Sequence, residues 1–488
     1  MNQILEQEDI IFTRQNSEPL LTPDFEVCGA DINSISYWNA INSFFSRKVD
    51  QTEGEYNRII NRYFAGSAIE MRSIISPSYI LSHEICTFVP KCKECPLKYN
   101  CAFYRSNDER ENPITFADFF AGAGGLSLGF EHAGLYPVLA NDIDPWFMAT
   151  YKYNRPNYST EISACDIQTW LMENELRSDW EIDIVSGGVP CQSFSMANRQ
   201  RKADDPRDKL YSALMRAAGL IKPKVILIEN VSGMIKEFDG VQSDLAALGY
   251  SSDHIIINSK DYGIPQSRKR LFFVAFSKNH FNDSADRVHR VITNIRDLRQ
   301  NHFVTLREAI ADLPALSAHT TRNDTKFNNE VSGRSFLFHE LKGASEYALK
   351  INENKIYTPL FNHKARYNNS RDIEIFHTLK PGENSLAESI KHIMPYSDRN
   401  GIFKDKYYKL QYNTYSKTIT AHMRYDCNMY IHPEQARGLT AREAARVQSF
   451  PDDYVFLGNF QRLYQQVGNA VPPLLAKILA KAIKNNIN

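Results

Sequence analysis

The sequence predicts an α/β protein built on a doubly wound sheet. Between Thr115 and about Ser277, short apolar runs alternate with stretches of helical periodicity, an alternation typical of a sheet covered by helices. The first run leads into closely spaced glycines, and acidic residues follow the next runs. Because an open α/β sheet binds ligands at the carboxyl ends of its strands, these turns are the first candidates for a functional site.

The expected elements follow in chain order. Strands are expected over the apolar runs 114–120, 137–140, 182–186, 225–229 and 271–276, and a helix over 210–221. A later helix begins at the capping box Thr440-Ala-Arg-Glu443, in which the two side chains satisfy free amides. Another follows Pro472-Pro473, because proline suits the first turn of a helix.

At 488 residues the chain is too long for one simple core. We expect an N-terminal extension (1–113), a first part of the main domain (114–279), an irregular second domain rich in Asn, Arg, Tyr and His (280–415) and the completion of the main domain (416–488). Lysine plus arginine equal aspartate plus glutamate at 57 each, so net charge decides nothing about a nucleic-acid partner. A polar N-terminus and no long apolar run predict a cytoplasmic protein without membrane contact.

The first turn has the composition of a nucleotide-type site. Phe120-Ala121-Gly122-Ala-Gly124-Gly125 joins a strand to a helix, where glycines allow close backbone approach and the helix offers free amides. The stretch lacks the full dinucleotide fingerprint and a P-loop lysine, which disfavours NAD and ATP. An acid after the second strand, Asp142 or Asp144, is placed to accept from ribose hydroxyls, and Asp166 suits an adenine amino group. A helix cap would explain either acid alone; their order favours a cofactor pocket.

One thiol is expected at the same edge of the sheet. Gly187-Gly188-Val189-Pro190-Cys191 follows the apolar run 182–185. A cysteine in such a position is a candidate nucleophile, and a buried structural cysteine is the alternative.

Further short motifs stand in a fixed order between about residue 114 and the C-terminus. Besides the glycine turn, they are Gly188-Val-Pro190-Cys191-Gln-Ser-Phe-Ser195, Glu229-Asn230-Val231, Gln266-Ser-Arg268-Lys-Arg270, Leu439–Pro451 and Gln466-Val-Gly468-Asn469. In this order they resemble the cytosine-C5 DNA methyltransferase family.

The resemblance implies a Rossmann-like fold dependent on S-adenosylmethionine and a known set of catalytic roles. Cys191 would add to C6 of a flipped cytosine and make C5 nucleophilic. Glu229, protonated or becoming so, would hydrogen-bond the ring N3 and the exocyclic amine, and Arg268 would orient the base carbonyl and favour the thiolate of Cys191. The alternatives are an ordinary ion pair for Glu229 and a solvated basic run for Arg268–Arg270.

The same resemblance implies the cofactor site. Phe120 would lie near the adenine, and the backbone from Ala121 through Gly122, Gly124 and Gly125 would line the methionine moiety. Asp142 would bind the ribose, although the family commonly has glutamate there and Asp144 competes for the role. The remaining pocket residues would be Ile143, Asp166, Ile167, Pro190 and Asn469.

A flipped base requires a second protein surface that recognises the surrounding DNA sequence. Residues 280–415 are expected to provide that surface for double-stranded DNA. Residues 260–300 carry nine Lys/Arg against four Asp/Glu, an excess that suits phosphate contacts. We expect a monomer in bacterial restriction–modification, with a cognate endonuclease acting on the same site without stable contact. The alternatives are a tRNA cytosine-C5 methyltransferase of the same fold and a non-catalytic DNA-binding paralogue.

Four cysteines cluster in the N-terminal extension. Cys86, Cys92, Cys95 and Cys101 fall within sixteen residues and include a Cys-x-x-Cys, which favours a metal site over reduced structural thiols. The stretch from Pro90 to Cys101 resembles the iron–sulfur loop of helix-hairpin-helix DNA glycosylases, with one residue's difference in the first spacing. It implies a [4Fe–4S] cluster, with structural zinc as the alternative.

Overall fold

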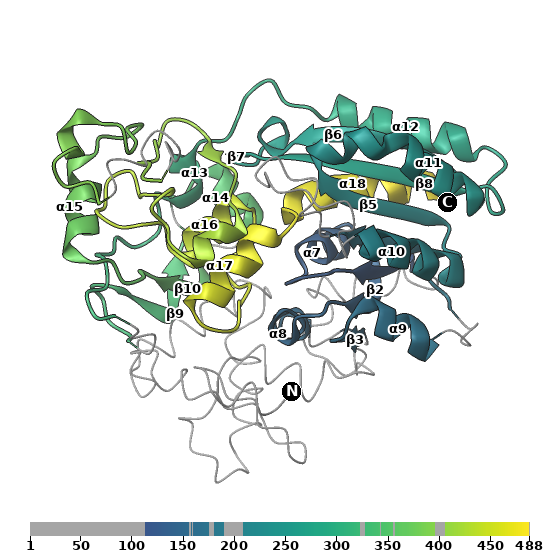
Figure 1. Cartoon of the computed structure of the whole chain (residues 1–488), viewed down its shortest axis with the longest axis horizontal. Coiled ribbons are helices and arrows are strands. Elements are labelled where there is room, and N and C mark those ends of the chain that lie inside the picture. Colours follow the sequence, from purple (N-terminus) through teal and green to yellow (C-terminus); the bar gives the residue numbers. More distant parts are fainter. Residues whose placement is uncertain are drawn as a thin grey trace, which may run out of the picture. The chain divides into compact units, whose positions relative to one another are not determined.

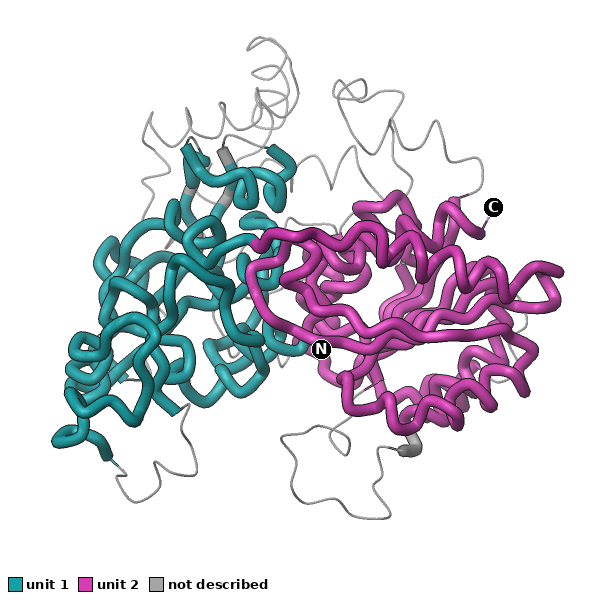
Figure 2. Tube along the Cα trace, turned by 90° about the horizontal axis from the view of Figure 1, so that it is seen from above, with its two compact units in different colours: residues 1–109, 304–469 teal, residues 110–303, 470–488 magenta. Residues whose placement is uncertain are grey.

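The computed structural model describes residues 113–155, 158, 160–174, 180–189, 208–322, 327–341, 343–354, 357–395 and 406–487. They fall into two compact units, shown in separate colours in Figure 2. One unit spans Val304–Asn469, and the other joins the described residues up to Phe303 with those from Ala470 onwards.

The second of these units is the sheet domain, and its elements are labelled in Figure 1. Its strands are β1 (Thr115–Phe119), β2 (Tyr136–Asn141), β3 (Glu161–Ser163), β4 (Ile184–Gly188), β5 (Val225–Val231), β6 (Tyr250–Asn258), β7 (Gln266–Ser267) and β8 (Lys269–Ser277), of which β1 and β4 carry no label in the figure. Its helices are α7 (Gly125–His132), α8 (Pro145–Tyr153), α9 (Ile167–Asn174), α10 (Asp208–Ile221), α11 (Phe238–Ala247), α12 (Ser284–Asp297) and α18 (Pro473–Ile487).

Seven strands form one sheet in the order β3-β2-β1-β4-β5-β8-β6. The strands from β3 to β5 are parallel, whereas β8 runs antiparallel to both β5 and β6. The predicted doubly wound α/β class is confirmed, and each predicted strand coincides with an observed one. The predicted strands did not include β3 and β6, and the direction of β8 was left open.

Two apolar cores hold helices on both faces of the sheet. On one face, Phe116, Leu227 and Phe272 pack with side chains of α7, α12 and α18. On the other face, Phe119, Ile228 and Phe273 pack with side chains of α9, α10 and α11. Successive strand residues point to opposite faces, so a continuous apolar run is what a strand covered on both sides requires.

The unit Val304–Asn469 has little sheet. It contains α13 (Leu306–Ile310), β9 (Gly333–Glu340), α14 (Glu346–Ile351), β10 (Tyr357–Lys364), α15 (Ser370–Thr378), β11 (Ser416–Lys417), a 3-10 turn η7 (Ala421–Arg424), α16 (Ala441–Val447) and α17 (Phe460–Asn469). Strands β9 and β10 form an antiparallel pair. The predicted capping box is confirmed at the start of α16. The Thr440 hydroxyl accepts from the Glu443 amide, and the Glu443 carboxylate accepts from the Thr440 amide.

The compact units divide the chain at places other than the sequence-based boundaries at 279 and 415. Residues 280–303 belong with the sheet domain, because α12 buries Val288, Val291 and Ile295 against β6, β8 and α18. Residues 416–469 belong with the other unit, where α16 packs on β10 and α13, and α17 packs on η7. In the part of the chain that is described, no helix is long and apolar enough to cross a membrane.

Candidate active site

The predicted site residues gather at one edge of the sheet because of strand direction. Strand β4 ends with Gly188 paired to Glu229, and β1 ends with Phe119 paired to Asn141. Strand β8 runs the opposite way, so its first residues reach this same edge, where Arg270 pairs with Val231. The ends of β1, β4 and β5 and the start of β8 therefore lie at one edge, which is where an open α/β sheet binds its ligands.

The glycine turn after β1 has an unusual backbone. Phe120, Gly122 and Gly124 all have positive φ, at 56°, 56° and 83°, a region that an aromatic residue rarely adopts. The amide of Ala121 donates to the carbonyl of Asn141 at 3.0 Å, which ties the turn to the end of β2. A strained aromatic in a turn held by neighbours is a frequent mark of a ligand site.

Asp142 and Asp144 have different tasks. The Asp142 carboxylate accepts from the Gly122 amide and the Asp144 amide, both at 2.9 Å, so it faces the glycine turn. The Asp144 carboxylate accepts from the Trp146 amide at 3.0 Å and caps α8. Burial raises the pKa of Asp142 to about 6. The geometry therefore favours Asp142 over Asp144 as the ribose acceptor.

The other predicted pocket residues differ in exposure and in their contacts. Ile143 is 67% exposed beside Asp142, an apolar side chain open to a ligand. Asp166 accepts from the Gln168 amide at 2.8 Å at the start of α9, so a helix cap accounts for at least one of its oxygens. Ile167 is 2% exposed and packs into the core with Phe119.

The nucleophile segment is visible as far as Val189. Cys191 and Pro190 lie outside the described residues. Asn230, which had no predicted role of its own, donates from its side-chain amide to the carbonyl of Val189 at 3.3 Å. It thereby holds the chain two residues before the thiol, at the end of β4.

The ion pair that stood as the alternative for Glu229 is present, and its partner is Arg270. The Arg270 Nε lies 2.8 Å from Glu229 Oε1, with both side chains mostly buried. A β-carbon on Gly188 would lie 3.3 Å from Glu229 Oε2, so the carboxylate covers the last residue of β4. Arg268 is 1% exposed and donates to the carbonyl of Ala470 at 3.0 Å.

Two predicted sites fall elsewhere. Asn469 is exposed at the end of α17, in the unit Val304–Asn469. Cys86, Cys92, Cys95 and Cys101 lie outside the described residues. Within the residues that are described, no group of three or more His, Cys, Asp or Glu side chains could hold a metal ion.

Comparison with known proteins decides the family. The model of the family described as C-5 cytosine-specific DNA methylase matches residues 114–485. The chain belongs to this family. It is a DNA cytosine-C5 methyltransferase, and membership supports S-adenosylmethionine as its methyl donor.

Curated relatives of this methyltransferase are similar over most of their length. The type II methyltransferase M.DdeI of Desulfomicrobium norvegicum is 33% identical, over 77% of this chain and 90% of the relative. The type II methyltransferase M.AgeI of Thalassovita gelatinovora is 32% identical, over 75% of this chain and 98% of the relative. A crystal structure of an E. coli prophage-encoded DNA modification methyltransferase shares the fold, with a TM-score of 0.54, 24% identity and coverage of 76% and 99%.

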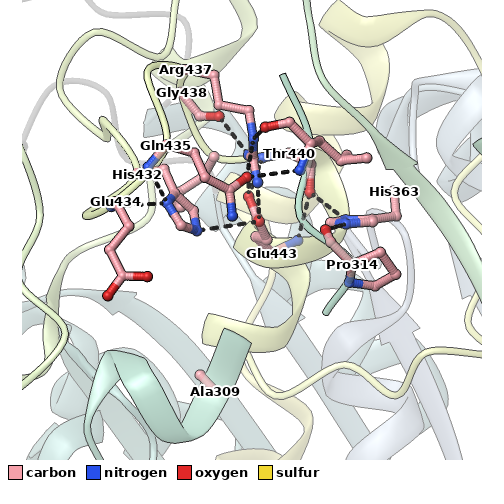
Figure 3. A network of polar contacts seen from close by, with 12 residues as sticks. Ala309, Pro314, His363, His432, Glu434, Gln435, Arg437, Gly438, Thr440 and Glu443 are labelled. Carbon is pink, nitrogen blue, oxygen red and sulfur yellow. Dashed lines mark hydrogen bonds and ion pairs between the residues drawn. The ribbon is translucent and has the colours of Figure 1, made fainter. Parts of the chain in front are cut away.

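The late charged motif of this methyltransferase, Leu439–Pro451, is buried. Glu443 accepts from both terminal nitrogens of Arg437, at 2.7 and 2.6 Å, next to His432 and His363 (Figure 3). Burial lowers the pKa of both histidines to about 4, so they are neutral near pH 7. These groups therefore stabilise the unit from within.

Two further arginines, both on α16, make separate buried contacts. Arg446 donates to both oxygens of Asp452, at 2.8 and 2.6 Å. Arg442 donates to the carbonyls of Phe361 and Pro451, at 2.7 and 2.6 Å. Both arginines are fully buried, so this motif marks internal support rather than a substrate surface.

Proposed function

We propose that this methyltransferase modifies one cytosine within a specific duplex DNA sequence, as the modification enzyme of a bacterial restriction–modification system. The names of its relatives, which are type II methyltransferases, support this role. The observation that carries the chemistry is the Glu229–Arg270 pair, which lies against the last residue of the strand leading to Cys191.

The reaction begins at C6 of the flipped cytosine, because C5 is a poor nucleophile until electron density is pushed onto it. The Cys191 thiolate forms a bond to C6, and the C5–C6 π electrons become available at C5. One Glu229 carboxyl oxygen accepts from the exocyclic amine, and the other, carrying a proton, donates to N3, which stabilises the ring as it loses aromaticity. After methylation, loss of the C5 proton and of the Cys191 sulfur restores the ring.

The positions of the arginines refine their roles. Arg270 holds the Glu229 carboxylate in one orientation through a charge-assisted contact. Arg268 stays a prediction as the base-orienting group; its contact with Ala470 would also keep the segment before β8 in register. Asn230 sets where the nucleophile segment leaves the sheet.

The residues present fit S-adenosylmethionine. The turn at Phe120–Gly125 offers a close backbone approach, Asp142 faces that turn, and Ile143 is exposed beside it. We assign the methionine moiety to the turn, the ribose to Asp142 and the adenine to Phe120 and Asp166. Ile143, Ile167, Pro190 and Asn469 stay predictions from the family resemblance. When bound, the cofactor supplies an electrophilic methyl group.

Sequence recognition is assigned to residues 304–415, within the unit Val304–Asn469. Of the nine basic residues in 260–300, Arg287 and Arg290 share Asp283, and Lys260 and Arg299 share Asp261. We assign these four to ion pairs within the sheet domain rather than to phosphate contacts.

The experiment that tests the substrate compares tritiated methyl transfer from S-adenosylmethionine to duplex DNA and to tRNA. We expect incorporation into DNA, at one sequence context when 5-methylcytosine positions are mapped in DNA from expressing cells. Methylation of tRNA alone would move the substrate to RNA, and no transfer to either would favour a non-catalytic DNA-binding protein. A monomer and a cognate endonuclease acting on the same sequence complete the proposal.

We also propose that Cys86, Cys92, Cys95 and Cys101 bind a [4Fe–4S] cluster, on the strength of their spacing alone. Anaerobic purification should give a brown protein with a broad visible absorption band. A colourless protein with one bound zinc would replace the cluster by structural zinc.

A further inference from the structure

A buried ion pair lies directly behind the glycine turn. Arg155, which follows the C-terminal end of α8, is 4% exposed. Its Nε donates to Oε1 of Glu131 on α7 at 2.5 Å, and the Glu131 side chain is 8% exposed. The pair therefore links α8 to the helix that begins at the turn.

The same guanidinium contacts the turn itself. Its Nη2 donates to the carbonyl oxygen of Gly124 at 2.9 Å. Its other face lies on the Tyr151 ring, with the guanidinium carbon 3.8 Å from the ring centroid. Nη1 donates to the Tyr151 carbonyl at 3.1 Å. One planar group thus joins Glu131, Tyr151 and the turn, which a fork of five donors allows and an ammonium does not.

The contact is close enough to constrain the turn. A β-carbon on Gly124 would lie 2.6 Å from Arg155 Nη1 and 2.7 Å from Cδ2 of Tyr151. Gly124 is also the N-cap residue of α7, with φ of 83°. The turn is therefore packed against the guanidinium with no room for a side chain between them.

Stability alone is a weak reason for this pair. Removing two charges from water costs several kcal/mol per ion, and an apolar pair of similar volume is often equally stable. Burial raises the pKa of Glu131 above its ordinary value even though the Arg155 guanidinium lies beside it. What an apolar pair could not supply is a donor to the Gly124 carbonyl.

We propose that Arg155 is a positioning residue for the cofactor: held by Glu131 and Tyr151, it keeps the Gly122–Gly125 turn in the conformation that receives the methionine moiety of S-adenosylmethionine. The proposal rests on the assignment of that turn to the cofactor. Arg155 itself does not touch the reacting atoms.

Two variants separate positioning from structural support. Arg155→Lys keeps a positive charge near Glu131 but loses the planar guanidinium that donates to Glu131 and Gly124 together. The double variant Arg155→Met/Glu131→Leu replaces the ion pair by an apolar pair, which preserves packing and removes the donor to Gly124. Arg290→Lys, in an exposed pair on α12, is the matched control.

The measurement is the dissociation constant for S-adenosylmethionine by calorimetry on the full chain, with the melting temperature and steady-state kinetics of the same proteins. We expect both variants to bind the cofactor about tenfold more weakly, the loss of one charge-assisted hydrogen bond to the turn. The KM for the cofactor rises, the KM for DNA is unchanged, and the double variant melts near the wild-type temperature. The control behaves as wild type.

Wild-type cofactor affinity in Arg155→Lys, or in a double variant that melts like wild type, overturns the proposal. Should the double variant not fold, Arg155→Lys decides. A wild-type protein that does not bind S-adenosylmethionine refutes the proposed function instead, so the two failures are distinguishable.

Discussion

We predict that the carboxylate of Asp142 makes cofactor binding depend on pH. Burial raises its pKa from 3.8 to about 6, so the group takes up a proton as the pH falls below that value. The ribose hydroxyls are proposed to donate to the ionised carboxylate, and protonation removes an acceptor from that contact. One pH unit below the pKa, roughly a tenth of the molecules remain ionised, so the apparent Kd rises about tenfold, or about 1.4 kcal/mol.

The assay is calorimetric titration of the full chain with S-adenosylmethionine from about pH 5 to about pH 8, a range that spans the shifted pKa. Asp142→Asn should bind S-adenosylmethionine weakly, with a Kd that does not change with pH. Asp118→Asn is the matched control, because burial raises the pKa of Asp118 to about 6 as well. Its carboxylate instead accepts from Ser127 and Ser186, so this variant should keep the wild-type slope. A wild-type Kd that stays constant across the range refutes the reasoning.

Three other contacts give further predictions. Gly129→Ala should lower the free energy of unfolding by about 1–3 kcal/mol, because the new β-carbon would lie 2.4 Å from atoms of α18. Gly240→Ala, whose β-carbon would meet nothing within 4 Å, should raise it by about 0.5–1 kcal/mol; denaturant titration measures both. Arg270→Gln should lower kcat at least about tenfold in steady-state assays by leaving its glutamate partner unpaired, and Arg270→Lys should recover part of the loss. Arg446→Met should lower the free energy of unfolding by about 3–5 kcal/mol in denaturant titration, because the fully buried Asp452 loses its partner.

Each of these has a result that would contradict it. Equal stability of Gly129→Ala and the wild type would mean that α7 and α18 can separate without cost. If Arg270→Lys had a kcat no higher than that of Arg270→Gln, the positive charge beside Glu229 would not be the reason for the lower kcat. An unchanged unfolding midpoint for Arg446→Met would mean that its ion pair contributes no net stability.

Much of the sheet domain could be predicted because its central strands β1, β4, β5 and β8 are covered on both faces. Such strands are continuous apolar runs, as at Val225–Ile228, and their ends carry the polar residues that serve the site. Local signals were equally dependable: the capping box at Thr440 and the proline start of α18 are set by neighbours in sequence.

The remainder depends on contacts between distant residues. The pairing of Glu229 with Arg270 requires that β8 run antiparallel to β5, and an apolar run does not state its direction. The link from Arg155 to Gly124 spans 31 positions. Burial of Arg442 and Arg446 was equally hidden, because charged residues on a helix ordinarily face solvent. The unit boundary near residue 303 follows from where the apolar face of α12 packs.

The central claim is that Cys191 forms a covalent bond to C6 of a cytosine in duplex DNA. It is tested most directly with DNA carrying 5-fluorocytosine at the methylated position, because fluorine cannot leave as the C5 proton does and the adduct persists. With S-adenosylmethionine present, we predict a denaturation-resistant protein–DNA complex whose cross-link maps by mass spectrometry to Cys191, and none with Cys191→Ala. A complex of equal yield with Cys191→Ala, or a cross-link at another residue, would contradict the account.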